Sequence, residues 1–94
     1  MSPSEYPTIA HIRNESQADI RLHLEMTGAE VVLPPGHAVE ILAKPSEMLL
    51  PLTIDYVEGG LQIHPYKEFD PDWHLRFRGK LVRADNLTVL SAGD

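Results

Sequence analysis

The sequence predicts an all-β domain, a small antiparallel β-sandwich or partly open barrel of about 7–8 short strands. Apolar and polar residues alternate at period two in several segments, whereas the helical period of 3.6 is nearly absent. Turn-forming residues recur at intervals of roughly eight to twelve residues, which is the spacing of short strands in a sandwich. These observations favour sheets over helices throughout the chain.

Residues 19–25 form the clearest predicted strand. Ile20, Leu22 and Leu24 share one side of this strand, so they are expected to face the core. Arg21, His23 and Glu25 share the other side and are expected to face solvent.

Residues 73–78 repeat this alternation, with Trp73, Leu75 and Phe77 expected to point inward. Further strands are expected at residues 8–13, 29–33, 37–43, 49–57, 61–65, 80–83 and 87–90. The segment 49–57 is the most apolar, which predicts a central strand. Pro51 indicates that this strand begins at an edge or a bulge.

Proline and glycine predict the turns between these strands. Pro34, Pro35 and Gly36 fit a type II turn, because proline presets a negative φ and glycine accepts a positive one. The sequence 58–60 predicts a tight hairpin. Residues 66–72 form the longest predicted loop, in which Asp70 and Pro71 could cap one short helical turn.

The 94 residues are sufficient for one domain, with an expected ordered core at 6–91 and frayed ends at 1–5 and 92–94. The chain has no cysteine, which excludes disulfides, zinc–thiolate sites and cysteine nucleophiles. Residues 1–7 lack a signal-peptide pattern, and the longest apolar run, 48–52, is far too short for a membrane span. We therefore expect a cytoplasmic protein without membrane contact.

The net charge of −6 argues against general binding of nucleic acid or anionic lipid. Basic residues nevertheless gather in the segment 74–83, which contains no acid. Its members are candidates for binding an acidic protein partner, a phosphate or the acidic face of a second copy of this domain; they are His74, Arg76, Arg78, Lys80 and Arg83. The alternative is a solvated sheet face whose charges deter aggregation between edges.

The sequence contains five histidines, a plentiful number of reactive side chains for a chain of 94 residues. His23, His64 and His74 could converge on a metal ion if their strands were neighbours; the alternative is scattered surface histidines. Glu68, Asp70 and Asp72 could offer oxygen ligands, although the calcium-loop pattern is missing. Nucleophile and phosphate-binding motifs are absent, so we expect neither catalysis nor a cofactor.

Residues 12–42 resemble small uncharacterised bacterial β-domain proteins. The resemblance rests on an Asn-x-Ser turn at 14–16, a strand that ends in Glu25, Gly28, and a Pro-Gly turn at 34–36. Many members continue after the glutamate with proline and an aromatic residue, where this chain has Met26 and Thr27. The resemblance implies a bacterial β-sandwich and carries no assigned activity.

Together these features predict a non-catalytic interaction or accessory module that binds a protein partner through an exposed sheet face. A homodimer through an edge strand is a further expectation. The alternative is a β-domain that binds a small ligand or metal through its surface histidines.

Overall fold

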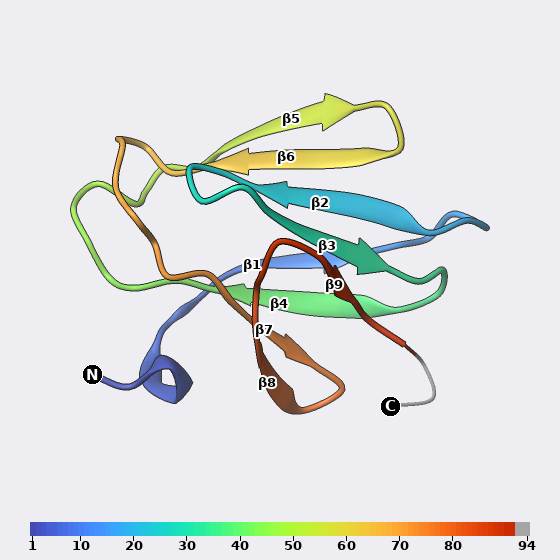
Figure 1. The fold of residues 1–94 in the computed structure, drawn as a ribbon, viewed down its shortest axis with the longest axis horizontal. Coiled ribbons are helices and arrows are strands. Elements are labelled where there is room, and N and C mark those ends of the chain that lie inside the picture. Colours follow the sequence, from blue (N-terminus) through green and yellow to red (C-terminus); the bar gives the residue numbers. More distant parts are fainter. Residues whose placement is uncertain (92–94) are drawn as a thin grey trace.

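A computed structural model describes residues 1–91 as two β-sheets packed face to face (Figure 1). A short 3₁₀ helix, Pro3–Glu5, precedes the strands and lies within the segment 1–5 that was expected to fray. The expected fraying of 92–94 lies outside the described residues. The predicted all-β sandwich is confirmed, with nine strands among residues 1–91 and no closed barrel.

The first sheet has four strands in the order β1-β4-β7-β8, and every neighbouring pair is antiparallel. Its strands are β1 (Thr8–Arg13), β4 (Ala38–Leu42), β7 (His74–Phe77) and β8 (Lys80–Arg83). This sheet occupies the lower half of Figure 1, with the N-terminal segment beside it.

The second sheet has five strands in the order β5-β6-β2-β3-β9. Its strands are β2 (Ile20–Leu24), β3 (Ala29–Leu33), β5 (Thr53–Val57), β6 (Gly60–His64) and β9 (Thr88–Val89). The sheet is mixed, because β2–β6 and β3–β9 pair in parallel, whereas the sequence predicted antiparallel pairing throughout. Alternation along a strand is the same for both directions of pairing, so it could not reveal this difference.

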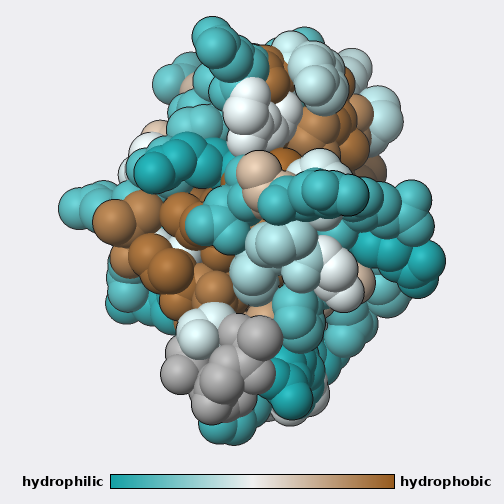
Figure 2. All heavy atoms as spheres, turned by 90° about the vertical axis from the view of Figure 1, so that its right-hand side faces the viewer, coloured by the Kyte–Doolittle hydropathy of each residue, from teal (hydrophilic) through white to brown (hydrophobic). Residues whose placement is uncertain are grey.

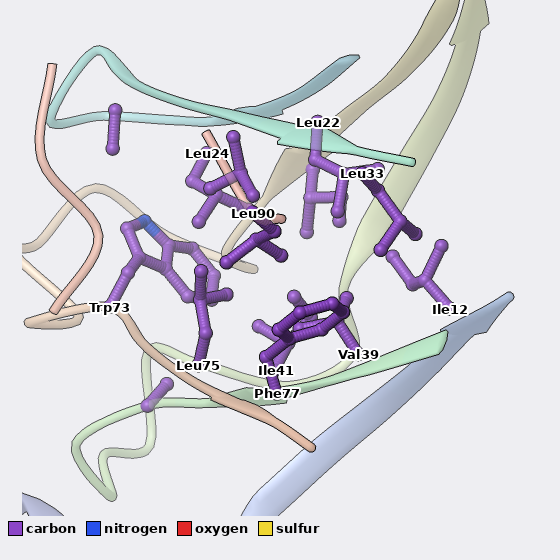
Figure 3. Close-up of a cluster of buried hydrophobic side chains, with 14 of the residues drawn as sticks. Ile12, Leu22, Leu24, Leu33, Val39, Ile41, Trp73, Leu75, Phe77 and Leu90 are labelled. Atoms are coloured by element: carbon purple, nitrogen blue, oxygen red, sulfur yellow. The ribbon is translucent and has the colours of Figure 1, made fainter. Parts of the chain in front are cut away.

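The hydrophobic core fills the space between the two sheets (Figure 3). The predicted inward faces are confirmed: Leu22, Leu24 and Leu75 have no solvent exposure, and Trp73 and Phe77 are also buried. The indole Nε1 of Trp73 donates a hydrogen bond of 2.8 Å to the backbone carbonyl of Glu25. This bond satisfies the one polar atom of a large core side chain.

The prediction of a central strand at 49–57 is wrong. The strand is β5, it lies at the edge of its sheet, and four of its five residues are exposed. The apolar residues that suggested a central strand lie in two different environments, some in the core and some on the exposed strand. Leu49 is buried in the turn before β5, with Leu52 packed against the core, whereas Ile54 is half exposed on the strand.

The two glycine turns form as predicted, and the short helical turn does not. Gly36 has a φ of +77° in the β3–β4 turn, and the two-residue turn Glu58-Gly59 joins β5 to β6. The segment at Asp70 and Pro71 contains no helical turn. The backbone N–H of Lys44 donates to the carbonyl of Pro71, and that of Asp72 to the Asp70 carboxylate.

Candidate functional site

The predicted basic face is divided between two sides of the first sheet. Directly opposed residues of antiparallel strands share a face, so His74, Arg76 and Arg83 lie on the outer face. Lys80 is opposite Phe77 and therefore lies on the inward side, at the exposed edge. Arg78 has a φ of +52° and occupies the turn before Gly79 instead of the strand.

The expectation that His74 projects into solvent is wrong. This residue is 7% exposed, and the ring of Tyr6 meets its imidazole edge-on at 5.7 Å. Its Nδ1 lies 2.7 Å from the backbone carbonyl oxygen of Asp72. On the outer face of β7, the imidazole is covered by Tyr6, which lies in the segment before β1.

Two basic side chains of this region lie beside carboxylates. Arg76 Nη1 lies 3.7 Å from Glu40 Oε1 on the neighbouring strand, and Arg83 Nε lies 3.8 Å from Asp85 Oδ1. Glu40 and Asp85 lie outside the basic segment in the sequence, one before it and one after it. The fold nevertheless brings their carboxylates close to its arginines. The basic residues therefore do not form one continuous surface.

The phenol of Tyr6 holds the N-terminal segment on the first sheet by donating a 2.7 Å hydrogen bond to Asp72 Oδ2. This bond, together with burial and the nearby charges of Asp72 and Asp70, raises the pKa of Tyr6 above 10.0. In the folded protein the neutral phenol therefore persists to higher pH than in the unfolded chain.

We expect stability to decrease as pH rises above about 10, because there the unfolded chain loses the Tyr6 proton before the folded protein does. Tyr6→Phe should be less stable than the wild type at neutral pH and should lose less stability between neutral pH and pH 11. Urea unfolding across this pH range measures both effects, with Tyr66→Phe as the control for an exposed tyrosine. An identical pH dependence in Tyr6→Phe and wild type would contradict this role.

The structure does not bring the three candidate metal histidines together. His23 and His64 lie on the outer face of the five-stranded sheet, and His74 lies on the outer face of the other sheet. The nearest carboxylates are Glu30, 3.9 Å from His23, and Asp55, 3.4 Å from His64. Within residues 1–91, no group of three or more histidine or acidic side chains could hold a metal ion.

The predicted oxygen-ligand loop contributes to a polar cleft of about 470 Å³. Asp70 and Asp72 line this cleft together with Asp85 and Arg83, whereas Glu68 is not part of it. Asp72 accepts the Tyr6 hydrogen bond, and Asp70 accepts one from the backbone of Asp72. These two carboxylates are therefore used in holding the loop and the N-terminal segment in place.

The sequence does not reveal that the edge strand β5 exposes large apolar side chains. Among residues 1–91, β5 pairs only with β6, on the far side of β6 from β2 (Figure 1). Ile54 is opposite the buried Ile63, and Tyr56 is opposite Leu61, so both lie on the side of the sheet that faces the core. They are nevertheless 49% and 89% exposed, which shows that this edge extends beyond the cover of the first sheet.

A cleft of about 420 Å³ lies beside this overhanging edge, between the β5–β6 hairpin and the β1–β2 connection. Its apolar lining includes Ile12, Ile20, Tyr56 and Leu61. Figure 2 looks at the end of the molecule that carries the β5–β6 turn, and its upper part shows apolar surface bordered by hydrophilic surface.

Gly60 holds the hairpin in this position. A Cβ atom at residue 60 would overlap the backbone carbonyl of Arg21, so only glycine allows β6 to approach β2 this closely. The backbone N–H of Arg21 also donates to the carbonyl of Gly59 at 2.9 Å. The hairpin and its apolar side are therefore fixed to the body of the domain.

Acidic side chains surround the apolar cleft and the β5 edge. Glu15 and Asp19 line the cleft, Asp55 projects from the outer face of β5, and Glu58 lies in the hairpin turn; all four are exposed. Arg13 also lines the cleft, with its Nη1 3.7 Å from Glu15. The surface near β5 is therefore apolar at its centre and mainly acidic at its rim.

The register of the hairpin defines which backbone groups of β5 point outward. Val57 and Gly60 flank a two-residue turn and so form a hydrogen-bonded pair. Because such pairs alternate with non-bonded pairs, Ile54 and Tyr56 direct their backbone N–H and C=O groups away from β6. Both apolar residues of the edge therefore offer unpaired backbone groups as well as exposed side chains.

These features define the class of the protein: a two-sheet β-sandwich with an exposed apolar edge strand. Comparison of the chain with protein-family models, with curated proteins and with solved structures finds no match. Among residues 1–91, no helix is long and apolar enough to cross a membrane.

Proposed function

We propose that this domain is a non-catalytic protein-binding module that captures an extended segment of a partner protein beside β5. The observation that carries this proposal is the overhang of β5, which exposes its backbone edge and the apolar side chains of Ile54 and Tyr56 together. Strand addition uses both features, because backbone hydrogen bonds supply affinity and side-chain pockets supply specificity.

The protection usual for a sheet edge is weak at β5, which supports a binding role. Edge strands commonly carry lysine, proline or a bulge, which prevent pairing with other chains. The strand from Thr53 to Val57 contains neither lysine nor proline, its register with β6 is regular, and Asp55 is its single charge. Tyrosine is also enriched where proteins meet, since it combines a large apolar ring with a hydroxyl.

Tyr56→Pro tests this proposal. The N–H of residue 56 points away from β6, so proline should remove a donor needed for strand addition while leaving the β5–β6 ladder intact. We expect the melting temperature to remain within a few degrees and the partner to be lost in affinity purification from the source cells. Tyr56→Thr keeps the N–H and should retain part of the binding, so it separates the backbone contribution from that of the side chain.

A second variant compares this edge with the basic segment. Arg76→Glu with Arg78→Glu should still fold, with a modest loss of stability, because Arg76→Glu places a carboxylate directly opposite Glu40 on β4. We expect this double variant to retain the partner. If Tyr56→Pro retained the partner protein and the double variant lost it, binding at β5 would be contradicted and the basic residues would be favoured as the binding site.

A further inference from the structure

We infer that the segment captured by β5 alternates apolar and basic residues, with its apolar residues opposite Ile54 and Tyr56. This inference rests on the proposed function and specifies the chemistry of its partner. It follows from the different character of the two sides of β5, since a paired strand must place its own side chains on the same two sides.

The inner side of β5 requires apolar side chains from the partner. Ile54 and Tyr56 lie on this side, with the apolar cleft of about 420 Å³ next to Tyr56 and Leu61. Partner residues directly opposite Ile54 and Tyr56 would share this side and cover the exposed apolar surface. Apolar side chains at those positions gain free energy by leaving water, whereas charged ones would lose hydration.

The outer side of β5 requires basic side chains from the partner. Asp55 lies on this side, and Glu58 follows in the turn; both are exposed. Opposite charges across a strand pair are favourable and like charges are unfavourable. The net charge of −6 also attracts a cationic segment at long range. The partner residues between the apolar ones are therefore lysine or arginine.

A second copy of this chain fits the edge poorly. Symmetric antiparallel pairing of two β5 strands centred on Asp55 would place the two Asp55 carboxylates opposite each other. Other registers still bring together two acidic rims formed by Glu15, Asp19, Asp55 and Glu58. Like charges at this distance disfavour association, so the chemistry favours a different, basic partner.

The same register predicts which partner backbone groups bind β5. Ile54 and Tyr56 direct their N–H and C=O groups outward, and in an antiparallel pair the residues directly opposite them exchange both hydrogen bonds. Those opposite residues are the apolar ones. The N–H groups of the basic residues would instead point away from β5, toward solvent.

Synthetic peptides test this inference directly. The probe is an acetylated and amidated peptide with three Lys-Val repeats, titrated into the ¹⁵N-labelled full chain while the amide signals of residues 53–57 are followed by NMR. We expect saturable shifts, strongest at Ile54 and Tyr56. A peptide with three Glu-Val repeats should bind at least about tenfold more weakly, and Asp55→Lys should reduce this difference between the two peptides.

Two methylated peptides distinguish strand addition from charge attraction alone. N-methylation of the three valines should weaken binding at least about tenfold, whereas N-methylation of the three lysines should change it by less than about threefold. Equal binding of both methylated peptides would overturn the inference, because the backbone of the peptide would then not pair with β5.

The remaining outcomes separate this inference from the proposed function. If the Lys-Val peptide does not bind while Tyr56→Pro still loses the native partner, the inference is wrong and β5 binds a partner of other chemistry. If the peptide does not bind, but the protein sediments as a dimer and Tyr56→Pro abolishes this dimer, a second copy of the chain is what binds the β5 edge. If Tyr56→Pro keeps the native partner, the proposed function itself fails.

Discussion

Replacing Leu22 with aspartate is expected to abolish cooperative folding. Leu22 lies at the centre of the second sheet with no solvent exposure, and nothing in the core cluster around it could pair with a carboxylate. Burying an unpaired charge costs several kcal/mol, which is comparable to the total stability of about 5–15 kcal/mol typical of a domain. Loss of the cooperative thermal transition in circular dichroism would measure the effect.

His23→Asp is the matched control for this variant. His23 is the next residue on the same strand, but its side chain points to the outer face and is 36% exposed. We expect His23→Asp to fold, with a modest loss of stability because Glu30 lies nearby. A soluble and cooperative Leu22→Asp, with His23→Asp unfolded, would show that the inner and outer faces are reversed.

Gly60→Ala is expected to detach the β5–β6 hairpin from the body of the sheet. The new methyl group would overlap backbone atoms of Arg21, which cannot move without disrupting β2, so β6 must shift away. We expect the free energy of unfolding to fall by more than about 3 kcal/mol, which is at the upper end of the range for overpacked variants. The cost is high because the atoms that the methyl group would overlap belong to the backbone and not to a flexible side chain. Chemical denaturation measures this loss.

Gly59→Ala provides the comparison for this substitution. Gly59 has a φ of +80° but has open space around the position of a Cβ atom. Alanine there should cost only about 1–2 kcal/mol, from the left-handed backbone conformation alone. If the two variants were equally destabilised, the close approach of β6 to β2 would not be what requires glycine at position 60.

Gly60→Ala also bears on the binding site. The hairpin presents Ile54 and Tyr56 only while β6 remains paired with β2. A folded Gly60→Ala protein should therefore lose the Lys-Val peptide together with the pairing of β6. In contrast, Gly59→Ala should bind the peptide with nearly unchanged affinity.

Most strands were predictable because alternation is a local property of the chain. The side chains of Leu22, Leu24, Leu75 and Phe77 point inward as the period-two pattern predicted. The turns at Gly36 and Gly59 were also predictable, since a positive φ is readily adopted by glycine.

The candidate site was much less predictable. The apolar content of 49–57 indicated burial, yet the strand lies at an edge, and only Leu49 and Leu52, which precede it, pack in or against the core. The outward alternation of His74 indicated exposure, yet Tyr6, distant in sequence, covers the ring. In both cases contacts with distant segments override the local pattern.

The amino-acid pattern alone was enough to predict that this chain forms strands, which side of most strands is apolar, and where the tight turns lie. The parallel pairing of two strand pairs, the edge position of β5 and the acidic rim around its exposed apolar side became evident in the folded protein. This difference arises because alternation reflects each strand's own two faces. The order of strands instead depends on packing between residues far apart in the chain, such as Leu24 with Ile63 and Val32 with Val89.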